Sequence, residues 1–116
     1  MRLVWVSRHE LTEENWRILR KAFGLEEIEV VQYTKTVEDI RELIEFADQH
    51  GADAFVVVLP PHLIQQLLQA TDKPVYRFVV EREVLPNGEA KFTPIGLERI
   101  VRVEIVTERV VSKGSQ

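Results

Sequence analysis

The sequence predicts an α/β fold, namely a small Rossmann-like three-layer domain with a mostly parallel sheet and an antiparallel β extension at its C-terminal end. Two observations predict this class. Three short apolar runs, each followed by a helix-like pattern, alternate along the first 70 residues, and this alternation is typical of a parallel sheet with helices on both faces. The turn signal Pro86-Asn87-Gly88 then separates two further β patterns, which indicates a hairpin.

The first strand-helix unit begins with the apolar run at residues 3–6, a pattern typical of a strand covered on both faces. Thr12 is the predicted N-cap of the following helix because two glutamates come directly after it, where they suit the helix dipole. Leu11 and Trp16 stand at the two positions of a hydrophobic staple. Gly24 predicts the end of the helix.

The second unit consists of a strand at residues 28–32 and a helix that ends at Gly51. We expect Thr36 to be the N-cap of this helix, with Asp39 three residues later as the partner in a capping box. The helix itself is indicated by apolar residues at i, i+3, i+4 and i+7, which are Ile40, Leu43, Ile44 and Ala47.

The third unit is an apolar strand at residues 54–59 that two prolines terminate, and Pro61 is expected to open the next helix. A fourth strand is expected at residues 75–80. Residues 99–110 alternate between apolar and polar side chains, which predicts a strand with one solvated face; a helix over residues 97–106 is the weaker alternative. Residues 1–111 are expected to form a single domain, with residues 112–116 as a disordered tail.

Composition excludes several classes of protein. The 116 residues are 45% hydrophobic and 29% charged, which is ordinary for a folded domain and unlike a disordered chain. The chain has no cysteine, and no apolar run is long enough for a membrane span or a signal peptide, so we expect a cytoplasmic protein without membrane contact. The net charge of −4 argues against duplex nucleic acid as a partner.

Polar residues follow each of the three parallel strands, and the loops after such strands meet at one edge of the sheet. Hydroxyls, cationic side chains and helix N-termini on these loops favour a phosphate-bearing ligand. The candidate residues are Ser7, Arg8 and His9 after the first strand, Thr34, Lys35 and Thr36 after the second, and Pro60, His62 and Gln65 after the third.

Each candidate also has an explanation without a ligand. Arg8 and Lys35 can simply be solvated, and capping alone accounts for Thr36. No metal site is predicted, because the histidines at positions 9, 50 and 62 lack a metal-ligand spacing. No cofactor is predicted either, since the loop after the first strand lacks the glycines of a dinucleotide or P-loop site.

Three segments carry a family resemblance: the start VWVSRH, the helix entry ELTEEN, and the strand end LPPHL. With these segments the chain resembles the small CRISPR-associated ring nucleases, which are compact CARF-like Rossmannoid proteins of type III CRISPR systems. The resemblance covers residues 1–70. It implies a homodimer that degrades cyclic tetra- or hexa-adenylate second messengers by metal-independent attack of a ribose 2'-hydroxyl, and so switches off CRISPR antiviral signalling.

The resemblance also implies roles for individual residues. Arg8 and Lys35 would stabilise phosphate charge, His9 or His62 would act as general acid or base, and Ser7 would position the ligand. Two alternatives remain open at this point. The same loops can form a nucleotide-binding module that does not cleave its ligand, and the C-terminal β segment can be the pairing edge of a structural interaction domain.

Overall fold

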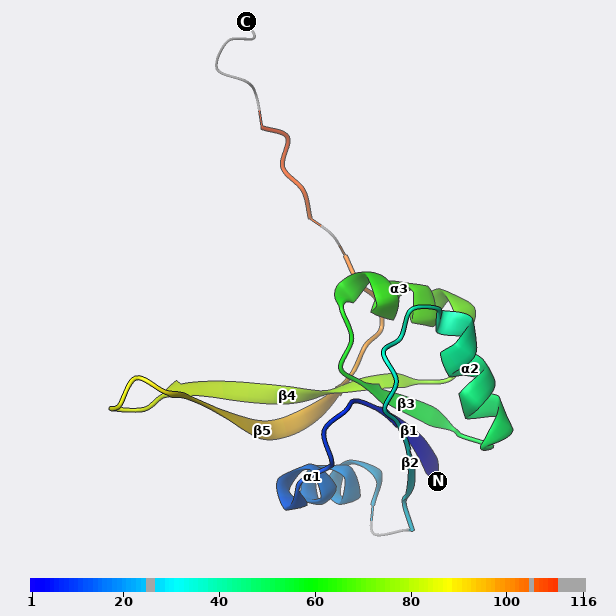
Figure 1. Ribbon diagram of the computed structural model, residues 1–116, viewed down its shortest axis with the longest axis horizontal. Coiled ribbons are helices and arrows are strands. Elements are labelled where there is room, and N and C mark those ends of the chain that lie inside the picture. The colour runs from blue at the N-terminus through cyan, green and yellow to red at the C-terminus, as the bar shows by residue number, and fades with distance from the viewer. Residues whose placement is uncertain (25–26, 105, 111–116) are drawn as a thin grey trace, which may run out of the picture.

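The computed structural model of the protein describes residues 1–24, 27–104 and 106–110 (Figure 1). It confirms the predicted α/β class: a five-stranded sheet has the order β2-β1-β3-β4-β5, in which β1 to β4 are parallel and β4 and β5 are antiparallel. The elements are β1 (Arg2–Val6), α1 (Glu13–Phe23), β2 (Glu29–Tyr33), α2 (Ile40–Gln49), β3 (Ala54–Val57), α3 (Pro61–Ala70), β4 (Val75–Val84) and β5 (Ala90–Arg99).

The two inner strands, β1 and β3, carry the core on both of their faces. Residues of alternate parity point to opposite faces of a strand, and the structure has two buried clusters accordingly. One cluster joins Val4, Val6, Phe55 and Val57 to residues of α2 and α3, and the other joins Leu3, Trp5, Ala54 and Val56 to Leu19 of α1. The sheet is therefore the middle layer of three, with α1 on one side and α2 and α3 on the other (Figure 1).

Helix starts were predicted correctly for α1 and wrongly for α2. Thr12 is the N-cap of α1 and forms a reciprocal capping box with Asn15. The N-cap of α2 is Asp39 rather than Thr36, because its side chain accepts a hydrogen bond from the backbone N–H of Arg41. Val37 is buried in the core just before the helix, so the chain enters the helix three residues later than the pattern indicated, at the stronger cap.

The other predicted helix boundaries agree with the structure, whereas β3 ends at Val57 rather than at residue 59 and β4 continues to Val84 rather than ending at residue 80. Pro61 is the first residue of α3, as expected. Gly24 and Gly51 follow α1 and α2 with φ values of +88° and +62°, which glycine adopts without the steric cost that a Cβ atom brings. Among the described residues, no helix combines the length and apolar character that crossing a membrane requires.

The β hairpin was predicted correctly, but its second strand was placed too late in the chain. Gly88 lies in the turn with φ +85°, and β5 runs from Ala90 to Arg99. The expected strand at residues 99–110 is wrong: residues 101–104 and 106–110 carry neither strand nor helix. Arg99 pairs with Tyr76 and the backbone N–H of Ile100 donates to the carbonyl oxygen of Val75, the first residue of β4, so the chain beyond Ile100 has no further β4 residues to pair with. The expected tail at residues 112–116 lies outside the described residues.

The outer part of the hairpin, residues 80–94, projects beyond the helices that cover the rest of the sheet (Figure 1). We call this part the outer hairpin. A register shift between Val79 and Val80 marks its beginning. Three of its apolar side chains are largely exposed: Val80 at 49%, Val84 at 65% and Phe92 at 64%. The outer hairpin thus presents apolar surface that its own domain does not cover.

Candidate functional site

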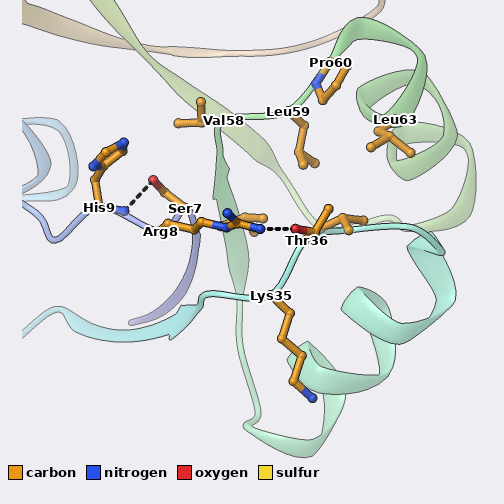
Figure 2. A pocket seen from close by; sticks show the side chains of 11 residues that line it. Ser7, Arg8, His9, Lys35, Thr36, Val58, Leu59, Pro60 and Leu63 are labelled. Carbon is orange, nitrogen blue, oxygen red and sulfur yellow. Dashed lines mark hydrogen bonds between the residues drawn. The ribbon is translucent and has the colours of Figure 1, made fainter.

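A pocket of about 340 Å³ lies at the carboxyl ends of the first three strands. Strands β2 and β3 flank β1 on opposite sides. The strand order therefore reverses at β1, and the loops after β1 and β3 leave a crevice at this point. Ligands of open α/β sheets bind at such a switch point. The pocket is lined by Val6, Ser7, Arg8, His9, Lys35, Thr36, Val37, Val58, Leu59, Pro60 and Leu63 (Figure 2); we call it the switch-point pocket.

The loop after β1 is held by hydrogen bonds from the strands beneath it. The amide of Gln32 donates to the carbonyl oxygens of Ser7 at 2.8 Å and of His9 at 3.0 Å, and the indole of Trp5 donates to the same His9 oxygen at 2.7 Å. The backbone N–H of His9 donates to Ser7 Oγ at 3.1 Å. These bonds fix the backbone of residues 7–9, so that the side chains of Arg8 and His9 project from a defined position.

Arg8 is the cationic group that the fold places most clearly at the pocket. Its guanidinium donates to the hydroxyl of Thr36 on the loop after β2 (Figure 2). Among the described residues, no carboxylate lies within ion-pair distance of Arg8, and no acidic residue lines the pocket. An arginine has five N–H donors in a planar fork, so Arg8 can bind a phosphate while Thr36 holds its orientation.

The nine residues predicted for the site divide into two groups. The first group lines the pocket and consists of Ser7, Arg8, His9, Lys35, Thr36 and Pro60. The second group, Thr34, His62 and Gln65, does not line it. Lys35 contributes to the lining, yet its side chain points away from the Arg8–Thr36 pair (Figure 2). Convergence of the three loops is thus confirmed for their backbones, while the ammonium group of Lys35 is directed elsewhere.

Of the helix N-termini expected on these loops, the one that lacks a side-chain cap is that of α3. Thr12 caps α1 and Asp39 caps α2, so both of these N-termini already have a side-chain acceptor. Helix α3 has Pro60 at its N-cap position and no side-chain cap. Pro60 and Leu63 of this first turn line the same pocket as Arg8, so the positive end of the α3 dipole faces the pocket and adds to the attraction for an anion. Pro60 and Pro61 have no N–H, and the N–H of Leu63 donates to the Pro60 carbonyl, so His62 supplies the backbone N–H that is left in this turn.

Sequence reasoning missed two kinds of site residue. The first is Gln32, which positions the loop after β1 and lies in register with Trp5; the signal for it is an amide directly after two valines, at the end of the strand predicted over residues 28–32. The second is the apolar lining that follows β3. Val58 is 64% exposed directly after a fully buried strand, and Leu59 lines the pocket beside it. Both belong to the apolar run that was assigned wholly to the strand.

The groups of the described residues with a shifted pKa are Tyr33, Asp39 and Arg41, and none of them lines the pocket. Burial raises the pKa of Tyr33 above its usual value, and the charge of Glu42 adds to this effect. A hydrogen bond from the Arg41 guanidinium lowers the pKa of Asp39, and the bond from the Arg41 backbone lowers it further. Within the described part of the chain, no cluster of histidine and carboxylate side chains has the arrangement of a metal site.

Comparison with known proteins adds no relative to this description: no family model, curated protein or solved structure matches the chain.

Proposed function

We propose that the protein binds a phosphodiester ligand in the switch-point pocket and cleaves it as a ring nuclease of cyclic oligoadenylate. The observation that supports this most strongly is Arg8 at the mouth of a pocket with no acidic lining, oriented by Thr36, with the uncapped start of α3 lining the same pocket. These features favour a phosphate group in the ligand. The cyclic oligoadenylate is proposed from the resemblance to ring nucleases.

The proposed reaction is an internal transfer within the ring. A ribose 2'-oxygen bonds to the adjacent phosphorus while the bond from that phosphorus to the 5'-oxygen of the next nucleotide breaks. The 2'-hydroxyl gives up its proton to a general base, and the departing 5'-oxygen takes a proton from a general acid. The products are a 2',3'-cyclic phosphate and a 5'-hydroxyl. The enzyme has to hold the 2'-oxygen in line and stabilise the charge on the phosphoryl oxygens.

Arg8 is the proposed partner of the phosphoryl oxygens, because it is the pocket cation whose guanidinium the structure orients toward the Thr36 side of the pocket (Figure 2). His9 is the proposed proton carrier. Ser7 and Thr36 position the ligand and Arg8 respectively. Lys35 reaches a phosphate only through a change of rotamer, and His62 and Gln65 act only on a part of the ligand that extends beyond the pocket.

The proposed assembly is a homodimer in the cytoplasm, in which two switch-point pockets face one ring across a two-fold axis. This arrangement follows from the resemblance, and it suits a symmetric ligand because an isologous dimer presents the same residues twice. Sedimentation velocity tests it: a species of twice the chain mass is expected, and a monomer that cleaves the ring at full rate contradicts it.

The experiment that tests the proposed activity is incubation with cyclic tetra- and hexa-adenylate in the presence of EDTA. We expect linear products that end in a 2',3'-cyclic phosphate. Arg8→Ala is expected to lower the rate about a hundredfold, since a charge-stabilising group is removed. Arg20→Ala on α1 removes the same charge away from the pocket and is expected to leave the rate unchanged. Intact rings at high enzyme concentration would overturn the proposed activity.

A nucleotide-binding module that does not cleave is the second candidate, because the pocket features that favour a phosphate do not by themselves require turnover. It predicts that cyclic adenylates raise the melting temperature by mass action and are recovered intact. His9→Ala then leaves binding and product analysis unchanged, whereas for the nuclease it abolishes most of the turnover without preventing binding.

A further inference from the structure

A second cavity, of about 490 Å³, lies between the start of α1, the end of β3 and the inner side of the hairpin. We call it the hairpin groove. Its walls are mainly apolar and include Trp5, Ile64, Phe78, Val80, Phe92 and Pro94. This size falls within the range of small-molecule sites, which are typically about 300–1,000 Å³, and a mostly apolar wall with few polar groups is their usual composition.

The hairpin groove is continuous with the switch-point pocket. Ser7, His9, Val58 and Leu59 line both cavities. Figure 2 shows His9 on the side of Ser7 opposite to the Arg8–Thr36 pair. A ligand whose phosphate lies at Arg8 therefore passes Ser7 and His9 when it extends into the groove.

The walls of the groove are suited to a flat aromatic group. Phe78 is fixed by an edge contact with Trp5, with ring centroids 5.6 Å apart. Phe92 lines the groove and is 64% exposed, so its ring is available for stacking; Arg82 is its neighbour on the paired strand. Asn15, Arg77 and Glu10 also line the groove. Arg77 is paired with Glu98 and the Asn15 Oδ1 accepts from Thr12, so the amide NH2 of Asn15 is the group that can bond to the edge of a heterocycle.

We infer that the hairpin groove binds the heterocyclic base of the same nucleotide whose phosphate lies at Arg8, with Phe92 as its stacking partner. The inference rests on the proposed function, because it assigns base and phosphate to one ligand. Stacking of a base on an aromatic side chain is usually worth about tenfold or more in affinity. Continuity with the pocket favours this occupant over a protein partner.

The test follows Trp5 fluorescence in the Trp16→Phe variant, in which Trp5 is the one indole left of the two in the chain. Titration with adenosine, which has no phosphate, is expected to change this fluorescence. Phe92→Ser is expected to weaken adenosine binding about tenfold or more. Val84→Ser is the matched control, since Val84 is equally exposed at 65% on the outer hairpin but does not line the groove, and it is expected to have no effect.

Adenosine 5'-monophosphate joins the two sites in one probe. It is expected to bind more tightly than adenosine, and Arg8→Ala is expected to remove this advantage while leaving adenosine binding unchanged. Equal affinity of the two probes would overturn the assignment to one ligand. Ribose 5-phosphate, which lacks a base, is expected to respond to Arg8→Ala and not to Phe92→Ser.

Two further results would overturn the inference. One is that adenosine leaves the fluorescence unchanged, or that Phe92→Ser and Val84→Ser weaken its binding equally. The other is that Phe92→Ser changes the sedimentation coefficient and not adenosine binding, which would mean that a second copy of the chain covers the groove. The adenosine test involves neither Arg8 nor cleavage, so uncleaved cyclic adenylate would refute the nuclease while leaving the base site intact.

Discussion

Strand β3 and the outer hairpin belong to one sheet and each carries a phenylalanine, yet they differ in what covers them. Phe55 in β3 is 0% exposed, whereas Phe92 in the outer hairpin is 64% exposed. Helices lie on both faces of β3, and the outer hairpin extends past all of them (Figure 1). Because both residues are phenylalanines, the comparison indicates that cover by the helices, not residue type, decides whether such a side chain stabilises the fold or is available for binding.

The largest effect is expected when one phenylalanine in each region is truncated to alanine. Phe55→Ala is expected to lower the free energy of unfolding by about 3–5 kcal/mol, because it leaves a cavity between β3 and the α2–α3 layer. Phe92→Ala is expected to change it by less than about 0.5 kcal/mol, as for an exposed side chain. Urea denaturation measures both. Equal losses would mean that the outer hairpin is packed in solution.

Hydrogen exchange tests the difference between the inner strands and the outer hairpin without any substitution. Amides of β1 and β3 are expected to exchange only on global unfolding, because opening these strands breaks both core clusters. Amides of the outer hairpin are expected to exchange about a hundredfold faster or more, through local opening of two strands that no helix covers. Equal protection in both regions would contradict the contrast drawn from their burial.

The part of the fold that could be predicted is the part specified by local signals. Continuous apolar runs marked β1 and β3, and Pro61 marked the start of α3. The strand at residues 99–110 was wrong because alternation shows which face a segment would bury but not whether a neighbouring strand is present. The true strand, β5, contains Pro94 and Gly96, which weaken a strand pattern in sequence but are tolerated beside an edge bulge.

The site was predictable to the level of loops and not of side-chain directions. Loops that follow parallel strands meet at one edge of the sheet. This rule correctly predicted that Arg8, Lys35 and Pro60 line one pocket. It could not show that Lys35 points away from Arg8 (Figure 2), because a loop residue's rotamer depends on tertiary contacts. It also missed Phe92, since the hairpin comes close to the pocket only through the long β4–β5 extension.

A smaller effect concerns the helices that cover the inner strands. Thr12→Ala is expected to destabilise the protein by about 1 kcal/mol, because it removes the N-cap of α1. Thr36→Ala is its matched control: Thr36 caps no helix, so it is expected to change stability by less than about 0.5 kcal/mol while weakening phosphate binding through Arg8. Thermal unfolding and ribose 5-phosphate titration measure the two effects. Equal destabilisation would restore Thr36 as a cap.

The smallest expected effect is the pH dependence that the Asp39 cap gives to α2. Hydrogen bonds from Arg41, at 2.9 Å from both its backbone N–H and its Nη2, lower the pKa of Asp39 below its unfolded value. A lowered pKa means that the unfolded chain binds the proton more readily. The stability that the ionised carboxylate provides is therefore complete above about pH 4, the usual aspartate value, and is lost as the pH falls through the lowered pKa.

Asp39→Asn isolates this contribution, because asparagine still caps a helix but does not ionise. The wild type is expected to be more stable than Asp39→Asn at pH 7, and the difference is expected to shrink as the pH is lowered from 4 to 2 in urea denaturation. Asp72→Asn controls for the loss of one exposed negative charge. If the difference between the wild type and Asp39→Asn stayed constant down to pH 2, the ionised carboxylate would contribute nothing to the stability of α2 beyond a neutral cap.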